Sequence, residues 1–142
     1  MPVYGSFANT IRNKHLPGLD KAMRETTKDS LDAIQTLVRK HTPVQTGRLR
    51  KSVKTSPVVK TSNKSTGEVY SDLYYAAAVE YGTHAHTIHA RPGSALNING
   101  HLVSQVHIRA HRGAHMFHHG AKEFEHGPAE FIAAKNLRRY IN

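Results

Sequence analysis

Apolar positions recur with a helical period in the first third of the chain. From Leu19 onward they return at steps of three and four residues, at Met23, Leu31, Ile34, Leu37 and Val38. This spacing places apolar side chains on one side of an α-helix. The run ends at Thr42-Pro43, because proline lacks an amide hydrogen and pushes the residue before it out of helical geometry. We therefore predict an amphipathic surface helix over residues 19–41.

The pattern changes to strands after residue 54. Residues 54–61 and 67–72 are rich in Val, Thr, Ser and Tyr and flank the polar loop Asn63-Lys64-Ser65-Thr66-Gly67, which predicts a hairpin. Two further strands are predicted at 84–90 and 101–109, with Asn97-Ile98-Asn99-Gly100 as the turn before the second. The alternation in 101–109 is offset, which indicates a bulge.

Shorter helices complete the pattern. A helical turn over 48–53 follows Thr46, whose hydroxyl can accept an amide two or three residues on. A short Ala-rich helix over 74–81 ends at Gly82, which suits the left-handed region. Helices are also predicted near 117–125 and 128–141, the second with an apolar side at Phe131, Ile132, Leu137 and Ile141. The predicted class is α+β: a long N-terminal helix packed on a small antiparallel β-sheet, with short helices and a C-terminal helix.

Length and composition limit the organisation. A chain of 142 residues suffices for one domain over 1–142. Within it, residues 1–17 are polar and without clear periodicity, which suggests an extended arm that orders against a neighbouring subunit. Residues 84–119 form a His-rich strand and loop region. The absence of cysteine fits assembly in a reducing cytoplasm. Apolar runs are too short to span a bilayer, so we expect a soluble protein with no membrane partner.

Positive charge is concentrated early in the chain. The formal net charge is +10, of which residues 1–64 contribute +9 and residues 65–142 only +1. Such an excess favours contact with nucleic acid or an acidic protein surface. Arg48, Arg50 and Lys51 would project from the turn over 48–53, with Lys54 just beyond. A solvated face that merely keeps the protein soluble is the alternative.

Two sequence elements resemble a known family. Residues 43–53 read Pro43-Val44-Gln45-Thr46-Gly47-Arg48-Leu49-Arg50-Lys51-Ser52-Val53, and residues 75–83 read Tyr75-Ala76-Ala77-Ala78-Val79-Glu80-Tyr81-Gly82-Thr83. They resemble the Pro-x-x-Thr-Gly-x-Leu-Arg-x-Ser and Tyr-Ala-x-x-Val-Glu-x-Gly-Thr elements of head–tail joining, or tail-completion, proteins of lambdoid siphophages. A third element at 113–117 resembles the family's Pro-Phe motif but lacks its proline. The resemblance marks Pro43, Thr46, Gly47, Leu49, Tyr75, Glu80, Gly82 and Thr83 as structural motif residues.

The resemblance implies a non-enzymatic structural role in the virion neck, without a cofactor. Proteins of this type are similar to ring-forming components, often six subunits around a channel that DNA crosses. The implied partners are further copies of the chain, neighbouring neck proteins on the head and tail sides, and DNA in non-specific contact. The implied location is the virion, after assembly in the host bacterial cytoplasm. Arg48, Arg50, Lys51 and Lys54 become candidates for the DNA channel or a subunit interface, since Lys and Arg attract phosphate without reading sequence.

Glu80 and the glycines of these elements have simpler explanations than catalysis. We expect Glu80, in its Ala-rich helix, to pair with an arginine such as Arg48 within or between subunits. Gly47 and Gly82 are expected to permit turn geometry that a side chain would obstruct.

Twelve histidines support competing hypotheses. His84 and His86 would share one strand face, and His111 and His115 stand four apart, so a Zn²⁺ or Ni²⁺ site could assemble. Protonation below about pH 6.5 could instead alter a subunit contact, and polar surface positions or ring packing would need neither. The alternative functions are therefore a small basic nucleic-acid-binding module, which lacks a helix-turn-helix or aromatic platform, and a His-dependent metal hydrolase.

Overall fold

The computed structural model describes residues 16–141, which divide into two compact units. The first unit, called unit 1 below, contains residues 16–72 and 116–141, and the second, unit 2, contains residues 73–115. Helices and short antiparallel strand pairs occur together, so the predicted α+β class is confirmed. The proposed arm over residues 1–17 lies outside the described residues, apart from the first two residues of helix α2.

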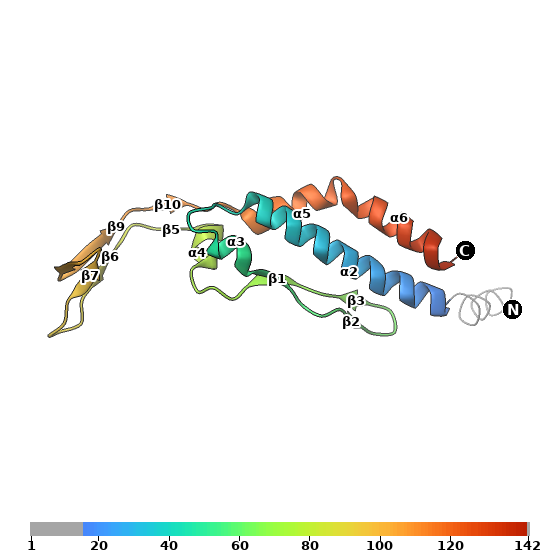
Figure 1. Cartoon of the computed structure of the whole chain (residues 1–142), viewed down its shortest axis with the longest axis horizontal. Helices are drawn as coiled ribbons and strands as arrows, with labels where there is room; N and C mark the ends of the chain where they lie inside the picture. The colour runs from blue at the N-terminus through green and yellow to red at the C-terminus, as the bar shows by residue number, and fades with distance from the viewer. Residues whose placement is uncertain (1–15, 142) are drawn as a thin grey trace, which may run out of the picture. The chain divides into compact units, whose positions relative to one another are not determined.

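Three helices form most of unit 1. Helix α2 (Leu16–His41) contacts α5 (Met116–Glu125) near its C-terminal end and α6 (Pro128–Ile141) along the rest (Figure 1). All three helices were predicted, and α2 begins three residues earlier than expected. Pro17 is tolerated there because the amides of a first helical turn have no intrahelical partner.

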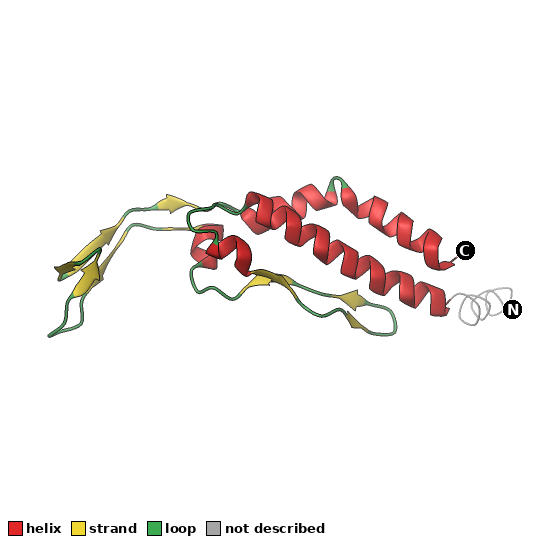
Figure 2. Cartoon of the chain, in the orientation of Figure 1, coloured by secondary structure: helices red, strands yellow, loops and turns green. Residues whose placement is uncertain are grey.

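A strand hairpin contacts α2 as well (Figure 2). Strand β1 (Val53–Thr55) pairs antiparallel with β4 (Val69–Ser71), and β2 (Val59–Lys60) pairs with β3 (Ser65–Thr66). The predicted hairpin is therefore present but split into two ladders. At the interruption the Ser56 amide donates to the Glu68 carbonyl and the Ser56 hydroxyl accepts from the Glu68 amide, each at 2.8 Å. Pro57, which has no amide to donate, occupies the break.

The core of unit 1 lies where the helices and hairpin meet α2. Its buried apolar side chains are Ala22, Leu31, Val38, Leu49, Val53, Met116 and Ile132. Gly120 of α5 lies directly on α2, since a Cβ there would approach the Val38 amide nitrogen to 2.9 Å. This contact lets the two helix backbones approach each other closely.

The predicted apolar side of α6 is only partly correct. Ile132 is buried, but Phe131 is 71% exposed and Leu137 is 43% exposed. Asn136 is buried instead, because its amide nitrogen donates to the Asp29 carboxylate of α2 at 3.0 Å. A polar side chain with a partner of this kind escapes most of the cost of burial.

Ion pairs tie the elements of unit 1 together. Glu123 of α5 accepts from Lys40 and from His41 of α2, each at 2.6 Å, and these contacts lower the pKa of the Glu123 carboxyl. Lys60 of the hairpin pairs with Asp20 at 2.8 Å. These bridges fix α5 to the C-terminal end of α2 and the hairpin to its N-terminal part.

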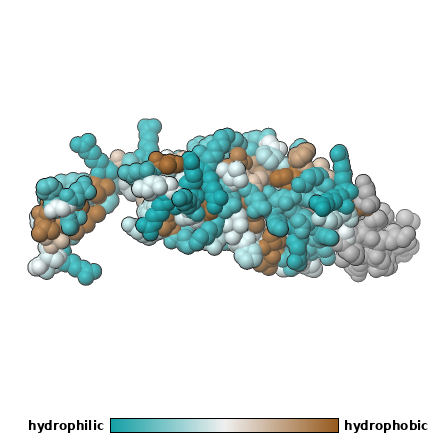
Figure 3. Space-filling view, in the orientation of Figure 1, coloured by the Kyte–Doolittle hydropathy of each residue, from teal (hydrophilic) through white to brown (hydrophobic). Residues whose placement is uncertain are grey.

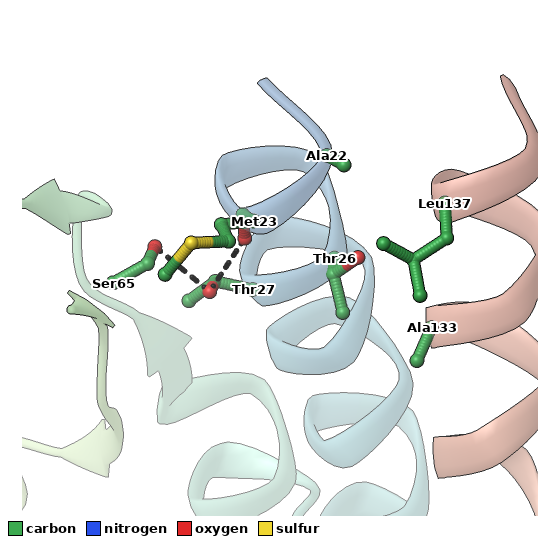
Figure 4. A pocket seen from close by; sticks show the side chains of 7 residues that line it. All are labelled: Ala22, Met23, Thr26, Thr27, Ser65, Ala133 and Leu137. Atoms are coloured by element: carbon green, nitrogen blue, oxygen red, sulfur yellow. Dashed lines mark hydrogen bonds between the residues drawn. The ribbon is translucent and has the colours of Figure 1, made fainter. Parts of the chain in front are cut away.

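An apolar recess opens between α2 and α6 (Figure 4). It is lined by Ala22, Met23, Thr26, Thr27, Ser65, Ala133 and Leu137. The Thr27 hydroxyl donates to the Met23 carbonyl at 2.9 Å and lies 2.8 Å from the Ser65 hydroxyl, which can donate to it; these contacts close the recess toward strand β3. None of the lining side chains is ionisable.

Unit 2 consists of a short helix followed by a long segment of paired antiparallel strands. Helix α4 (Ala76–Tyr81) leads into residues 82–112, which we call the strand arm. In the arm β5 (Gly82–Thr83) pairs with β10 (His111–Arg112), β6 (His86–His89) with β9 (Gln105–Ile108), and β7 (Leu96–Ile98) with β8 (His101–Val103). Asn99 and Gly100 turn the arm at φ 50° and 88°, the positive values that two-residue hairpin turns require. The predicted strand 101–109 is divided at Ser104, where an irregularity was expected.

We predict that Gly120→Ala will destabilise unit 1. The new Cβ would press on the backbone of Val38, which cannot move without shifting α2, so we expect a loss of about 1–3 kcal/mol in the free energy of unfolding. Urea unfolding followed by circular dichroism measures this loss. Gly127→Ala is the matched control: its Cβ would come no closer than 3.4 Å to the Glu123 carbonyl, so a similar loss in both variants would contradict the packing argument.

We also predict that Asp29 contributes a pH-dependent part of the stability. The hydrogen bond from Asn136, followed by the contact with Lys135, lowers the pKa of Asp29 below its ordinary 3.8. A carboxyl with a lowered folded-state pKa stabilises the fold above its unfolded pKa, and this stabilisation is lost as the pH falls through the folded value. Asp29→Asn should therefore cost roughly 0.5–1 kcal/mol at pH 7 and progressively less below about pH 4.

Urea unfolding at pH 7 and at pH 3 tests this dependence. Asp32→Asn is the control, because the exposed Asp32 side chain on the same helix has no hydrogen-bond or ion-pair partner among residues 16–141. A pH-independent effect of Asp29→Asn, or an equal effect of Asp32→Asn, would show that the charge of Asp29 is not responsible.

Candidate functional site

The basic turn over residues 42–54 begins where α2 ends. Thr42 is buried, and its hydroxyl donates to the Val38 carbonyl at 2.6 Å. Helix α3 (Arg48–Ser52) follows, with Gly47 as its N-cap at φ 78°. Thr46 was predicted as the cap; its hydroxyl does accept the Arg48 amide two residues on, at 3.4 Å, but Gly47 occupies the N-cap position. Leu49 is buried beneath the turn, so the basic residues around it point outward.

The four predicted basic residues differ in whether their side chains have hydrogen-bond or ion-pair partners. Arg50 donates from Nη2 to the Thr42 carbonyl at 3.3 Å, just beyond the negative end of the α2 dipole. Lys54 pairs with Asp72 at 2.8 Å, which raises the pKa of Lys54 and lowers that of Asp72. The exposed side chains of Arg48 and Lys51 have no hydrogen-bond or ion-pair partner within residues 16–141. Two of the four basic side chains, Arg48 and Lys51, therefore have no partner within residues 16–141.

The sequence did not reveal the side chains that hold the turn in place. Gln35 Nε2 and Arg39 Nη2 of α2 both donate to the Val53 carbonyl at 2.9 Å. The Ser52 hydroxyl contacts the Ser71 hydroxyl at 2.7 Å, joining the end of α3 to strand β4. Gln35 and Arg39 carry no sequence signal beyond lying beside the apolar stripe of α2. Their role depends on a carbonyl 14 to 18 residues away.

The second sequence element forms helix α4 and the base of the strand arm. Tyr75 is the N-cap of α4, and Ala76 and Glu80 are its buried residues. The carbonyls of Val79 and Glu80 accept the amides of Ala114 and His115 at 2.7 and 3.1 Å. Residues 75–83 and 111–115 are thereby fastened together, which gives the third element, at 113–117, a structural role.

Gly82 is required at this junction for two reasons. Its φ of 82° and ψ of −179° fall in a region essentially restricted to glycine, and this differs from the left-handed helical cap that was predicted. A Cβ would also collide with the His111 carbonyl oxygen and approach the Gly113 amide nitrogen to 2.6 Å. A Cβ on Gly113 would likewise collide with the Glu80 carbonyl oxygen. Gly82 and Gly113 therefore permit backbone to pack on backbone where the arm begins.

Glu80 and Arg48 belong to different units. Glu80 is buried, with 6% of its surface exposed, and Arg48 is exposed. Their predicted pairing, within or between subunits, stays a prediction.

The candidate metal ligands do not come together as a metal site would require. Within residues 16–141 no group of three or more His, Cys, Asp or Glu side chains is placed to hold a metal ion. His86 Nδ1 contacts the His84 carbonyl at 2.9 Å, and His111 Nδ1 contacts the Arg112 carbonyl at 3.1 Å. His115 follows at φ 50°. The imidazoles of His86 and His111 are thus engaged with nearby backbone carbonyls.

We predict that Gly82→Ala will loosen the base of the strand arm. Backbone strain and the collision with His111 together should cost about 3 kcal/mol, so the amides of Ala114 and His115 should exchange roughly a hundredfold faster. Hydrogen exchange followed by NMR reports on these amides directly. Gly100→Ala is the control in the same unit, since its φ is also positive at 88° but a Cβ there would meet nothing within 4 Å. Equal protection in Gly82→Ala and native protein would contradict this assignment.

The described part of the chain contains no helix long and apolar enough to cross a membrane. A family model described as "Bacteriophage HK97-gp10, putative tail-component" matches residues 7–82, which is more than half of the chain. The match includes the basic turn and helix α4. Comparisons with curated proteins and with solved structures gave no match. The chain therefore belongs to the HK97-gp10-like family of bacteriophage tail components.

Proposed function

We propose that this protein is a non-enzymatic structural subunit of the phage neck that joins head to tail and forms a ring around the DNA channel. Membership of a phage tail-component family supports a place in the virion and contact with other phage structural proteins. The proposal of a ring in the neck rests on the sequence elements at 43–53 and 75–83. We propose six copies per ring, bounded by a head-side connector and by the tail terminator or tube, after assembly in the host cytoplasm.

The observation that carries this proposal is the pair of free cations on the fixed turn. Arg48 and Lys51 are exposed and lack partners among residues 16–141, while Gln35 and Arg39 anchor the adjoining backbone to α2. Cations held on a fixed backbone attract phosphate at any sequence, because the phosphate charge repeats along DNA regardless of base. Such contact would let DNA slide past.

The other two basic candidates have narrower roles in this proposal. Arg50 donates to the carbonyl of Thr42 and so stabilises the end of α2. The charge of Lys54 is offset by Asp72. We therefore assign contact with DNA, or with a neighbouring subunit, mainly to Arg48 and Lys51.

Silencing the gene in its source phage or prophage tests the neck function. We expect electron microscopy to show filled heads and separate tails, because each would be complete except for the joint. Restoring the gene in trans should restore joined particles. Intact, infectious virions without the protein would overturn the proposal.

The salt dependence of DNA binding tests the two cations. The logarithm of the binding constant falls with the logarithm of salt concentration by about 0.9 for each phosphate contact on duplex DNA. We expect Arg48→Gln combined with Lys51→Gln to reduce this slope by about 2 for the full chain on duplex DNA. Lys54→Gln should leave the slope nearly unchanged, because Asp72 already offsets that charge. A native slope in the double variant would exclude these residues from contact with DNA.

A further inference from the structure

Two cross-strand pairs place four polar side chains on one face of the strand arm. In the ladder of β6 and β9, Thr87 lies opposite His107 and His89 lies opposite Gln105. Residues opposite each other in an antiparallel pair share a face, and so do alternate residues of one strand. The Thr87 hydroxyl contacts His107 Nδ1 at 2.6 Å, and the side chains of His89, Gln105 and His107 are exposed. Every position on this face of the ladder thus carries a hydrogen-bonding side chain.

Two arginines extend this face at its ends. Arg91 follows His89 by two residues and Arg109 follows His107 by two, the spacing that returns to the same face of an extended strand. Because the strands are antiparallel, the two arginines stand at opposite ends of the face. Both are exposed and have no hydrogen-bond or ion-pair partner in the described part of the chain. We call the following residues the polar face of the arm: Thr87, His89, Arg91, Gln105, His107 and Arg109.

The opposite face of the same ladder is mainly apolar. It carries the cross-strand pair of Ile88 with Val106, and Ile108 opposite His86. Ile88 is 42% exposed. Figure 3 shows both teal, hydrophilic surface and brown, hydrophobic surface over the strands of the arm. The ribbon is thus two-sided, and a ligand of the polar face gains charge contacts and hydrogen bonds rather than apolar contact.

The positive charge of the polar face is not offset by carboxylates in its own segment, since residues 81–122 contain no Asp or Glu. Strands β6 and β9 pack chiefly on each other, so the groups that face His89 and His107 are those of the polar face itself. These comprise the two arginines, which are charged at any physiological pH, and two neutral polar side chains. Protonation of the two imidazoles below about pH 6.5 would raise the positive charge of the face further. The ligand must therefore be negatively charged.

The chemistry of the polar face favours the phosphate backbone of DNA over an acidic protein surface. Protein–protein interfaces generally have an apolar centre, and this face offers none. Interfaces with DNA are more polar and more positively charged, and Arg, Thr and Gln side chains are among the groups that contact phosphate. A two-stranded ribbon also fits the major groove of B-DNA, about 12 Å wide, whereas the major groove of A-form RNA is too narrow. Duplex DNA is therefore the ligand that matches both the shape and the charge.

We propose that the polar face of the arm binds the phosphate backbone of duplex DNA, with Arg91 and Arg109 as its cations at neutral pH. Below about pH 6.5, His89 and His107 add charge and strengthen the binding. The Nδ1 of His107 contacts Thr87, which leaves its Nε2 to donate to phosphate. This assignment rests on the proposed function in taking DNA as a partner of the protein. It adds a second DNA-binding surface that differs from the basic turn in its position and in its response to pH.

The salt dependence of duplex DNA binding at pH 7.5 tests the two arginines. Each phosphate contact contributes about 0.9 to the slope of the logarithm of the binding constant against the logarithm of salt concentration, so Arg91→Gln combined with Arg109→Gln should reduce the slope of the full chain by about 2. Arg112→Gln combined with Arg138→Gln is the matched control. It removes two exposed charges that also lack partners among residues 16–141 but lie outside the polar face. A native slope in the first variant, or an equal reduction in the control, would overturn the proposal.

The same measurement at pH 5.5 tests the histidines. We expect the native chain to bind more tightly than at pH 7.5 and with a steeper salt dependence. His89→Gln combined with His107→Gln should lower the slope at pH 5.5 by about 2 and leave it unchanged at pH 7.5. His86→Gln combined with His101→Gln is the control, since each of these exposed histidines lies opposite an isoleucine in its ladder. The same response to pH in both double variants would contradict the role of the polar face.

Cross-linking tests which face of the arm meets DNA. The chain has no cysteine, so Gln105→Cys and Ile88→Cys each offer a single attachment point for a short aryl azide. Gln105 lies on the polar face and Ile88 on the opposite one. We expect about fivefold more cross-linked duplex DNA from position 105, because phosphate contacts fix the orientation of a protein on the duplex. Equal yields, or a higher yield from position 88, would assign DNA to the wrong face.

Poly-L-glutamate distinguishes DNA from an acidic protein as the partner. At equal concentrations of negative charge we expect it to bind the full chain more weakly than duplex DNA does. If poly-L-glutamate bound as tightly as DNA, and Arg91→Gln combined with Arg109→Gln weakened both equally, the face would recognise carboxylates as well as phosphates. The assignment to DNA would then fail.

The neck function and the DNA-binding face can fail separately. If silencing the gene separates heads from tails while the variants of the polar face bind DNA like the native chain, the neck function stands and the face does not bind DNA. If virions form without the protein while these variants lose the predicted salt dependence, the reverse holds.

Discussion

The contact between Val38 and Gly120 is the constraint on which unit 1 depends. Without a side chain at Gly120, helix α5 comes close enough for its backbone to touch that of α2. The carbonyl of the same Val38 accepts a hydrogen bond from the Thr42 hydroxyl, so the end of α2 is fixed close to this contact. On the same helix, Gln35 and Arg39 donate to the Val53 carbonyl. The basic turn is thus built beside a close contact between two helix backbones.

Local rules were enough to predict most elements, because they depend on near neighbours. The period of apolar residues predicted α2, and Pro43 marked where it ends. The Asn99-Gly100 pair predicted a turn whose positive φ angles were then found. The split of the first hairpin at Ser56 was missed, since it depends on hydrogen bonds to Glu68 across the ladder. Asn136 was likewise missed because Asp29, its partner, is 107 residues away.

In the candidate site, too, features set by neighbouring residues were predicted, whereas contacts between residues distant in sequence were not. Sequence indicated a basic turn, and the geometry around Gly47 and Leu49 confirms that its charged residues face outward. It could not indicate that Asp72 offsets Lys54 or that Arg50 bonds to the end of α2, since both partners are specified only by folding. The choice among four similar cations therefore required three-dimensional contacts. Histidine abundance was also ambiguous in sequence, because spacing alone cannot show whether rings converge.

The distribution of charge along the chain limits what the strand arm can contact. Residues 81–122 contain no Asp or Glu, and the arm contains Arg91, Arg109 and Arg112. The basic turn of unit 1 likewise exposes Arg48 and Lys51. Like charges that face each other across an interface oppose association. A tail component with this distribution therefore favours partner surfaces that carry negative groups, both at the arm and at the basic turn.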